Sequence, residues 1–180
     1  MKYSDIKKFP FAAYTVHVSW AGLKDWLEHN NHGIKKLDMD PEYQRGYVWD
    51  VYQQRSYVEY MLKGGFSGAD IFWNCPTWMN YTNNPGSNIV ELVDGKQRIH
   101  AVIEFLENRL WVFNGSYLKD FDNDYFLENI YFIVHVNNLK ERKDVVEWYL
   151  GFNTGGSIHT REDLMPAYEL LTKLNKEMIK

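Results

Sequence analysis

The residues with the clearest chemical potential are 94–98, read DGKQR, which stand between two apolar runs. The spacing of apolar residues predicts a strand before this segment and a helix after it. A helix that begins here presents unpaired N–H groups and the positive end of its dipole, and both attract anions. The segment therefore predicts a phosphate site at the start of a helix.

The residue types inside the segment suit such a site. Gly95 permits a tight turn and the close approach of a ligand. Arg98 can donate two hydrogen bonds to a phosphate, and Lys96 adds a second cation. Asp94 could hold Mg²⁺ or activate a water or hydroxyl. The alternative is a strand-to-helix corner in which Asp94 caps the helix and pairs with Arg98. Local spacing favours neither interpretation, and no Walker GxxxxGK[ST] loop occurs in the chain.

Two further segments carry polar residues that could join this site. Residues 40–50, DPEYQRGYVWD, place Gln44 and Arg45 among aromatic residues, which by itself fits a surface loop with aromatic anchors. Residues 151–164, GFNTGGSIHTREDL, are rich in glycine and by themselves predict a flexible connection between helices. The polar residues of that second segment are Asn153, Thr154 and His159.

Taken in order, PEYQRGYVWD, VDGKQRIHAVIEF and YLGFNTGGSIHTRED resemble the signature segments of the N-terminal domain of GmrSD-type modification-dependent restriction proteins. The resemblance covers about residues 37–164. It implies an α+β fold of the ParB/sulfiredoxin-like superfamily, with a mixed sheet and surrounding helices in a single domain over residues 1–180. It also implies Mg²⁺-dependent binding and hydrolysis of a nucleoside triphosphate in a phage or prokaryotic DNA modification or restriction context.

The same resemblance implies roles for individual residues. Gly95 and Arg98 occupy the phosphate-holding Gly-x-x-Arg turn, and Asp94 is the acid needed for hydrolysis or phosphoryl transfer and a candidate Mg²⁺ ligand. Lys96 replaces a glutamine of the family motif and should strengthen the attraction for phosphate. The residues implied to line the pocket or contact the ligand are Gln44, Arg45, Gln97 and Asn153.

Two other functions remain open. The domain could be a ParB-like kinase in which Asp94 deprotonates a hydroxyl on a small molecule or modified DNA base. It could also be a non-catalytic module that senses a nucleotide or DNA. GmrSD-type proteins continue into a nuclease domain with a histidine-based metal site, whereas the six histidines here show no metal-binding spacing. We therefore expect no HNH-type nuclease in this chain, and either DNA or a separate nuclease or modification protein as its partner besides the nucleotide.

Composition limits the class of protein. A length of 180 residues with 45% hydrophobic and 24% charged residues is typical of one soluble domain. A net charge of -4 argues against nonspecific coating of nucleic acid, though a local basic cleft remains compatible with it. The single Cys75 excludes an internal disulfide and fits a reducing cytosol. No apolar run is long enough for a membrane span or signal peptide, so we expect a cytoplasmic protein.

Periodicity predicts the elements that must position these residues. We expect strands over residues 11–20, 34–39, 69–75, 88–93, 109–115 and 129–136. We expect helices over residues 19–29, with Ser19 as N-cap and Gly33 as stop, 51–63, 99–108, within 139–153 ending at Gly151, and from Thr160. Pro166 should kink the last helix or delay its start. Core burial is favoured for Trp73, Trp78 and Tyr81.

Overall fold

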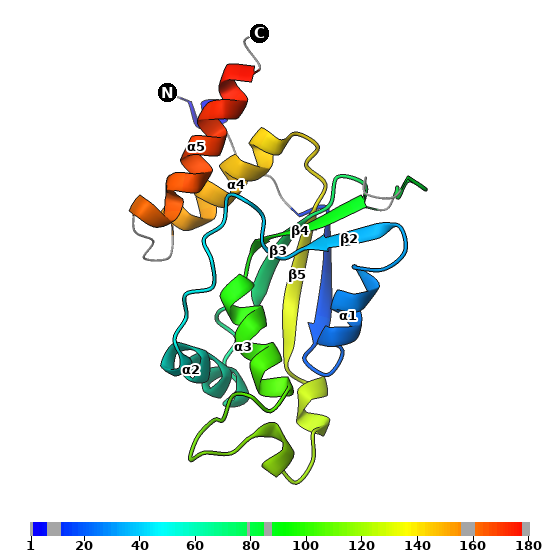
Figure 1. Ribbon diagram of the computed structural model, residues 1–180, viewed down its shortest axis with the longest axis vertical. Coiled ribbons are helices and arrows are strands. Elements are labelled where there is room, and N and C mark those ends of the chain that lie inside the picture. Colours follow the sequence, from blue (N-terminus) through cyan, green and yellow to red (C-terminus); the bar gives the residue numbers. More distant parts are fainter. Residues whose placement is uncertain (1, 7–11, 79, 85–87, 156–160, 178–180) are drawn as a thin grey trace.

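A five-stranded mixed sheet forms the centre of the protein (Figure 1). The computed structural model describes residues 2–6, 12–78, 80–84, 88–155 and 161–177. The strand order is β1-β5-β3-β4-β2, where β1 is Tyr14–Ser19, β2 Lys35–Asp38, β3 Asp70–Asn74, β4 Asn88–Asp94 and β5 Tyr131–Asn137. The pairs β1/β5 and β3/β4 are antiparallel, and β2/β4 and β3/β5 are parallel. The prediction of an α+β fold with a mixed sheet is confirmed.

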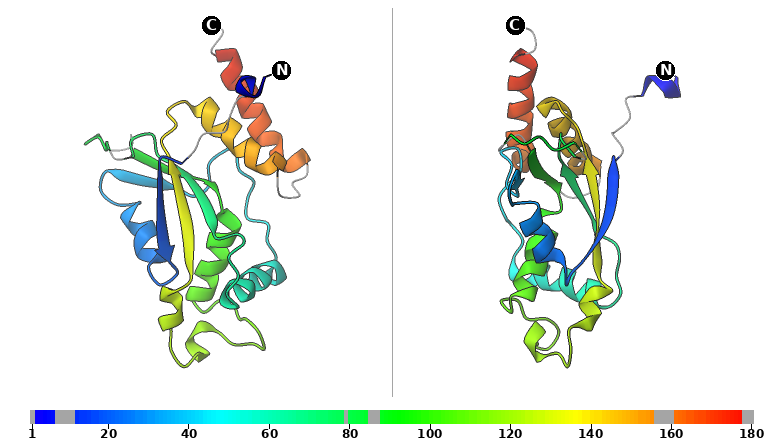
Figure 2. Two further views of the ribbon diagram at one scale, coloured as in Figure 1. Left: turned by 180° about the vertical axis from the view of Figure 1, so that it is seen from behind. Right: turned by 90° about the vertical axis from the view of Figure 1, so that its right-hand side faces the viewer.

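Helices cover the sheet unevenly. In the described ranges they are α1 (Leu23–His29), α2 (Val51–Leu62), α3 (Lys96–Leu106), α4 (Arg142–Gly155) and α5 (Arg161–Glu177), with short 3-10 turns at Tyr3–Asp5, Leu118–Asp120 and Tyr125–Glu128. Both α4 and α5 lie at one end of the molecule, opposite the end that holds the last two 3-10 turns (Figure 2). The site described below lies where α4 meets the sheet.

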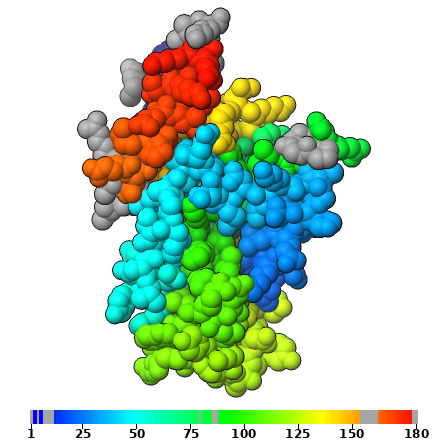
Figure 3. Space-filling model, in the orientation of Figure 1, coloured from blue at the N-terminus to red at the C-terminus, as the bar shows by residue number. Residues whose placement is uncertain are grey.

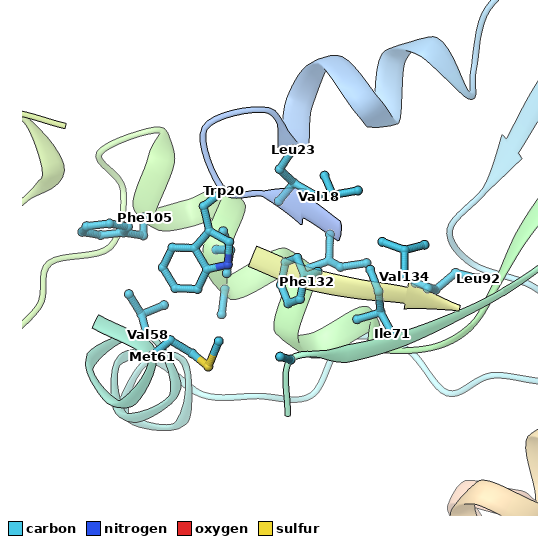
Figure 4. Close-up of a cluster of buried hydrophobic side chains, with 14 of the residues drawn as sticks. Val18, Trp20, Leu23, Val58, Met61, Ile71, Leu92, Phe105, Phe132 and Val134 are labelled. Atoms are coloured by element: carbon cyan, nitrogen blue, oxygen red, sulfur yellow. The ribbon is translucent and has the colours of Figure 1, made fainter. Parts of the chain in front are cut away.

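The main core lies between one face of the sheet and helices α1, α2 and α3. Side chains alternate along a strand, so every second residue of β3 and β5 points into this core. Figure 4 labels ten of its buried side chains: Val18, Trp20, Leu23, Val58, Met61, Ile71, Leu92, Phe105, Phe132 and Val134. Trp73 is fully buried, and Trp78 and Tyr81 pack against the core, as predicted.

A second apolar cluster joins the opposite face of the sheet to α4. Phe72, which alternates with Ile71 along β3, contacts the ring of Phe152 at a centroid distance of 4.3 Å. Tyr43 is fully buried, and its ring lies 5.0 Å from that of Tyr149 in α4. This packing holds the long segment between β2 and α2 beside α4. In the space-filling view, that segment passes between α5 and α3 (Figure 3).

Most predicted elements are present near their predicted positions, namely β1, β2, α2, β3, β4 and β5. The first helix is shorter than predicted, because α1 begins at Leu23. Ser19 is not its N-cap: the Ser19 Oγ accepts a hydrogen bond from the Gly22 N–H at 3.2 Å and so stabilises the turn between β1 and α1. Gly33 lies beyond the helix, which ends at His29.

The strand predicted over residues 109–115 is wrong. The only strand-like pairing there, within the described residues, is an isolated bridge between Val112 and Ser116. Leu110 and Val112 are buried. The apolar pattern that suggested a strand therefore reflects burial in the core rather than a place in the sheet.

The helices near the site also begin or end away from their predicted positions. α3 begins at Lys96, three residues before the predicted start. α4 continues through Gly151, so the predicted end is wrong and Asn153 belongs to a helix rather than a loop. α5 begins at Arg161 and contains Pro166, so a delayed start is wrong. His159 lies outside the described residues.

Candidate functional site

A small cavity lies where β4 ends and α3 begins. Its volume is about 40 Å³. The residues that line it are Gln44, Arg45, Val93, Asp94, Gly95, Lys96, Gln97, Tyr149 and Asn153. Three segments that are distant in the sequence therefore meet here, and together they supply every predicted site residue except Arg98.

Gly95 sets the angle at which α3 leaves the sheet. Its φ of 113° lies in the left-handed region, which is unfavourable for residues other than glycine. A Cβ at this position would lie 2.4 Å from the Cγ2 atom of Ile71 in β3. The predicted tight turn is present. The group that approaches the glycine closely is the side chain of Ile71 in the sheet, whereas the prediction assigned this approach to a ligand.

Two glutamine side chains hold the segment between β2 and α2 against the site. The Gln44 Nε2 donates hydrogen bonds to carbonyl oxygens of β4, including that of Val93 at 2.8 Å. The Gln97 Oε1 accepts from the N–H groups of Val48 at 3.0 Å and Trp49 at 3.1 Å. Both glutamines line the cavity, and their amide groups bind main-chain atoms.

The two cations at the cavity each have a carboxylate partner. The Arg45 Nη1 donates to the Asp163 Oδ2 at 2.8 Å. The Lys96 Nζ pairs with the carboxylate of Asp40 and also donates to the carbonyl oxygen of Arg45 at 3.2 Å. A ligand phosphate must therefore compete with a protein carboxylate for either cation.

Arg98 points away from the cavity. Its Nη1 donates to the carbonyl oxygens of Gly68 at 3.2 Å and Asp70 at 2.6 Å, and its Nη2 pairs with the carboxylate of Asp94. These contacts join the first turn of α3 to the start of β3. The predicted role of Arg98 in binding phosphate stays a prediction, and the structure gives this side chain a clear structural role.

Asp94 belongs both to the cavity and to the ion pair with Arg98. Its side chain is 33% exposed. The N-cap of α3 is Gly95, and no side-chain hydrogen bond caps the helix. The alternative interpretation of this segment, a strand-to-helix corner, predicted that Asp94 pairs with Arg98 and caps the helix. The ion pair is present, and the cap is absent. The carboxylate retains the solvent access that a general base or metal ligand requires.

Tyr149 lines the cavity but was missed from sequence. It is buried, and burial raises the pKa of its phenol to about 12, so the hydroxyl is neutral at physiological pH. One turn later, the Asn153 Nδ2 donates to the Tyr149 carbonyl oxygen at 2.7 Å. Residues four apart share a helix face. A predicted helix that continued past Gly151 would have placed Tyr149 and Asn153 on the same helix face.

Asp163 was also missed, and no local signal could have found it. It is 118 residues from Arg45 in the sequence and lies in the first turn of α5. In the described part of the chain, no three histidine, cysteine or acidic side chains are grouped so as to hold a metal ion. None of the described helices combines the length and apolar character needed to cross a membrane.

The mixed sheet, the strand–turn–helix at Gly95 and the polar cavity beside it define an α+β domain consistent with the ParB/sulfiredoxin-like fold. The chain belongs to the family of the GmrSD restriction endonuclease N-terminal domain, whose model matches residues 23–175. The match confirms the predicted resemblance and spans every predicted site residue. It indicates a restriction-related context. Comparison with curated proteins and with solved structures gave no match.

Proposed function

We propose that this domain binds a nucleoside triphosphate with its phosphate groups at the start of α3, and hydrolyses it with Mg²⁺. The observation that carries the proposal is the convergence of Arg45, Asp94, Lys96 and Asn153, which come from three distant segments, on one cavity at the amino end of α3. Unpaired N–H groups and the helix dipole favour an anion at that place. Membership of the GmrSD N-terminal domain family supports a role in DNA restriction.

The size of the cavity limits how a ligand can enter. Pockets for small molecules usually measure about 300–1,000 Å³. At about 40 Å³, this cavity has no room for a whole nucleotide. Phosphate can reach the N–H groups of α3 if Arg45 and Lys96 exchange their carboxylate partners for the ligand. Binding should therefore be accompanied by local rearrangement.

The residues at the cavity fit a magnesium ion that arrives with the triphosphate. Mg²⁺ in nucleotide sites is commonly held by one or two carboxylates together with substrate phosphates and water. Asp94 can supply one such carboxylate, because its hydrogen bond with Arg98 uses Oδ2 and its side chain is 33% exposed. A bound ion would neutralise charge on the phosphates.

The side chains of the domain would contribute in complementary ways. Asp94 would orient a water molecule or accept its proton. Arg45 and Lys96 would balance the negative charge that develops on the transferred phosphoryl group. The neutral hydroxyl of Tyr149 and the amide of Asn153 could donate hydrogen bonds without adding charge.

The test is phosphate release from ribo- and deoxynucleoside triphosphates with Mg²⁺, comparing wild type with Asp94→Asn. Loss of a general base should slow release by about 100-fold or more while binding is retained. Asp122→Asn is the matched control, since Asp122 is exposed and does not line the cavity. Equal rates in wild type and Asp94→Asn would contradict the assignment of Asp94.

The same assay separates the other functions. Binding without release by wild type, followed by transfer when a hydroxyl acceptor is added, would favour a kinase. Binding without either reaction would favour a sensing module. Failure to bind any triphosphate would leave residues 94–98 as a structural corner.

A further inference from the structure

The ion pair between Arg45 and Asp163 connects the candidate site to α5. Asp163 lies in the first turn of that helix, and its Oδ2 accepts a hydrogen bond from the Arg45 Nη1 at 2.8 Å. Both side chains are largely buried, with exposed fractions of 25% for Arg45 and 22% for Asp163. Burial of this kind reduces the screening that makes exposed ion pairs weak.

We propose that Asp163 is a displaceable counter-ion of the phosphate site, through which α5 controls the entry of an anion. When a phosphate binds, Arg45 exchanges the carboxylate of Asp163 for the ligand. The proposal rests on the proposed function, because it concerns the regulation of the same site. It assigns a role to α5, none of whose described side chains lines the cavity.

The chemistry of the guanidinium supports an exchange. Carboxylate and phosphate both match its fork of donors, so the two anions compete for the same N–H groups. The main chain of Arg45 has a separate anchor, because the Lys96 Nζ donates to its carbonyl oxygen at 3.2 Å. The side chain can therefore change partner while the backbone stays beside α3.

The charges around the cavity explain why an exchange is needed. Arg45 pairs with Asp163, Lys96 pairs with Asp40, and the adjoining Arg98 pairs with Asp94. These three pairs cancel formally, so the cations offer a triphosphate little net attraction until a pair opens. Among the three pairs, that of Arg45 is the one that ties the cavity to another helix.

The attachment of α5 suits such a movement. The helix packs on α4 through an apolar seam that includes the buried side chains of Leu164 and Ala167. The helix projects beyond the sheet (Figure 1). Its side chains Met165 and Tyr168 are exposed. A shift of its first turn would leave the five strands and the main core unchanged.

Competition between Asp163 and the anion predicts the direction in which the anion affinity should change. Removing the carboxylate of Asp163 removes a competitor, so an anion should bind more tightly. By linkage, a bound anion must weaken the hold of Arg45 on α5 by the same factor. The opposite role, in which Asp163 orients Arg45 for the ligand, predicts weaker binding when the carboxylate is removed.

The test uses inorganic tripolyphosphate as the probe and Asp163→Asn as the variant, measured by titration calorimetry. We expect affinity about 10-fold higher than in wild type, the scale of one charge-assisted hydrogen bond. Glu162→Gln is the matched control, because Glu162 is the exposed neighbour on the same turn and its substitution makes the same charge change. In wild type, tripolyphosphate should also speed hydrogen exchange in the first turn of α5.

Equal or weaker binding by Asp163→Asn, with circular dichroism showing an intact fold, would overturn the counter-ion role. So would an absence of binding in both proteins, because removing the competitor should uncover the site. Nucleotide turnover gives an independent readout. Tighter tripolyphosphate binding by Asp163→Asn without nucleotide turnover would support the counter-ion role and refute hydrolysis. Nucleotide turnover with equal tripolyphosphate affinity in wild type and Asp163→Asn would support hydrolysis and refute the counter-ion role.

Discussion

Replacing Gly95 by alanine tests how the start of α3 is built. The substitution adds one methyl group at a residue whose φ is 113°. That methyl would lie 2.4 Å from the Cγ2 and 2.9 Å from the Cβ of Ile71, a fully buried residue of β3. Because Ile71 is held in the core on its other sides, it cannot move away without disturbing its neighbours.

Two contributions make up the expected loss of stability. A left-handed backbone conformation costs a side-chain-bearing residue roughly 1–2 kcal/mol. Forcing an extra methyl into a packed region costs roughly 1–3 kcal/mol more. The free energy of unfolding should therefore fall by about 2–5 kcal/mol, a large part of the total for a typical domain of about 5–15 kcal/mol.

Gly115→Ala separates the two contributions. Gly115 has a φ of 99°, but an added Cβ would meet no atom within 4 Å. This variant should lose only the backbone contribution, roughly 1–2 kcal/mol. Urea unfolding of wild type and both variants, followed by tryptophan fluorescence and analysed at constant m-value, measures the difference.

The reasoning fails if Gly95→Ala is no less stable than Gly115→Ala. A stable Gly95→Ala that had lost affinity for tripolyphosphate would return Gly95 to its predicted role, in which glycine allows a ligand to approach. A destabilised Gly95→Ala would show instead that the glycine serves the contact between α3 and β3.

Two further predictions concern charged groups. Arg98→Ala should lower the free energy of unfolding by about 2–4 kcal/mol, because it removes hydrogen bonds to the carbonyl oxygens of Gly68 and Asp70 and leaves the carboxylate of Asp94 without this ion-pair partner. Arg109→Ala, at an exposed ion pair, should have a clearly smaller effect in the same urea titration, and equal losses would contradict the structural role. Burial raises the pKa of Glu91, although Arg142 opposes the shift. A raised folded-state pKa gives stability that is present below the unfolded value of 4.5 and lost as pH rises. The stability of wild type relative to Glu91→Gln should therefore decrease as the pH of the urea titration rises above that value, and an increase would refute the sign.

Sequence alone was sufficient for features that depend on neighbouring residues. The strand–turn–helix around residues 88–106 follows from apolar periodicity and from a glycine where the chain must turn. The amphipathic helix α2 has a local start signal, since Asp50 accepts a hydrogen bond from the Gln53 N–H at 2.8 Å. The family resemblance identified most residues that line the cavity, because each belongs to a short motif.

Boundaries near the site were less predictable, because tertiary packing overrides local signals. Gly151 resembles a helix end, yet α4 continues past it, and Phe152, the next residue, packs on the ring of Phe72. Residues 109–115 have the apolar pattern of a strand, yet Leu110 and Val112 are buried in the core without belonging to the sheet. A glycine or an apolar run indicates a local conformational preference. Tertiary contacts decide whether the chain adopts that conformation.

The sequence by itself determined that an acid, a glycine and two cations stand at the start of a helix. Only the tertiary structure decided which of them face the cavity: Lys96 lines it, whereas Arg98 turns to the carbonyl oxygens near β3. The tertiary structure also brought Asp163 to Arg45 across 118 residues. The reason is physical. Side-chain direction and ion pairing depend on groups that become neighbours only when the sheet and helices pack, and no local pattern records those distances.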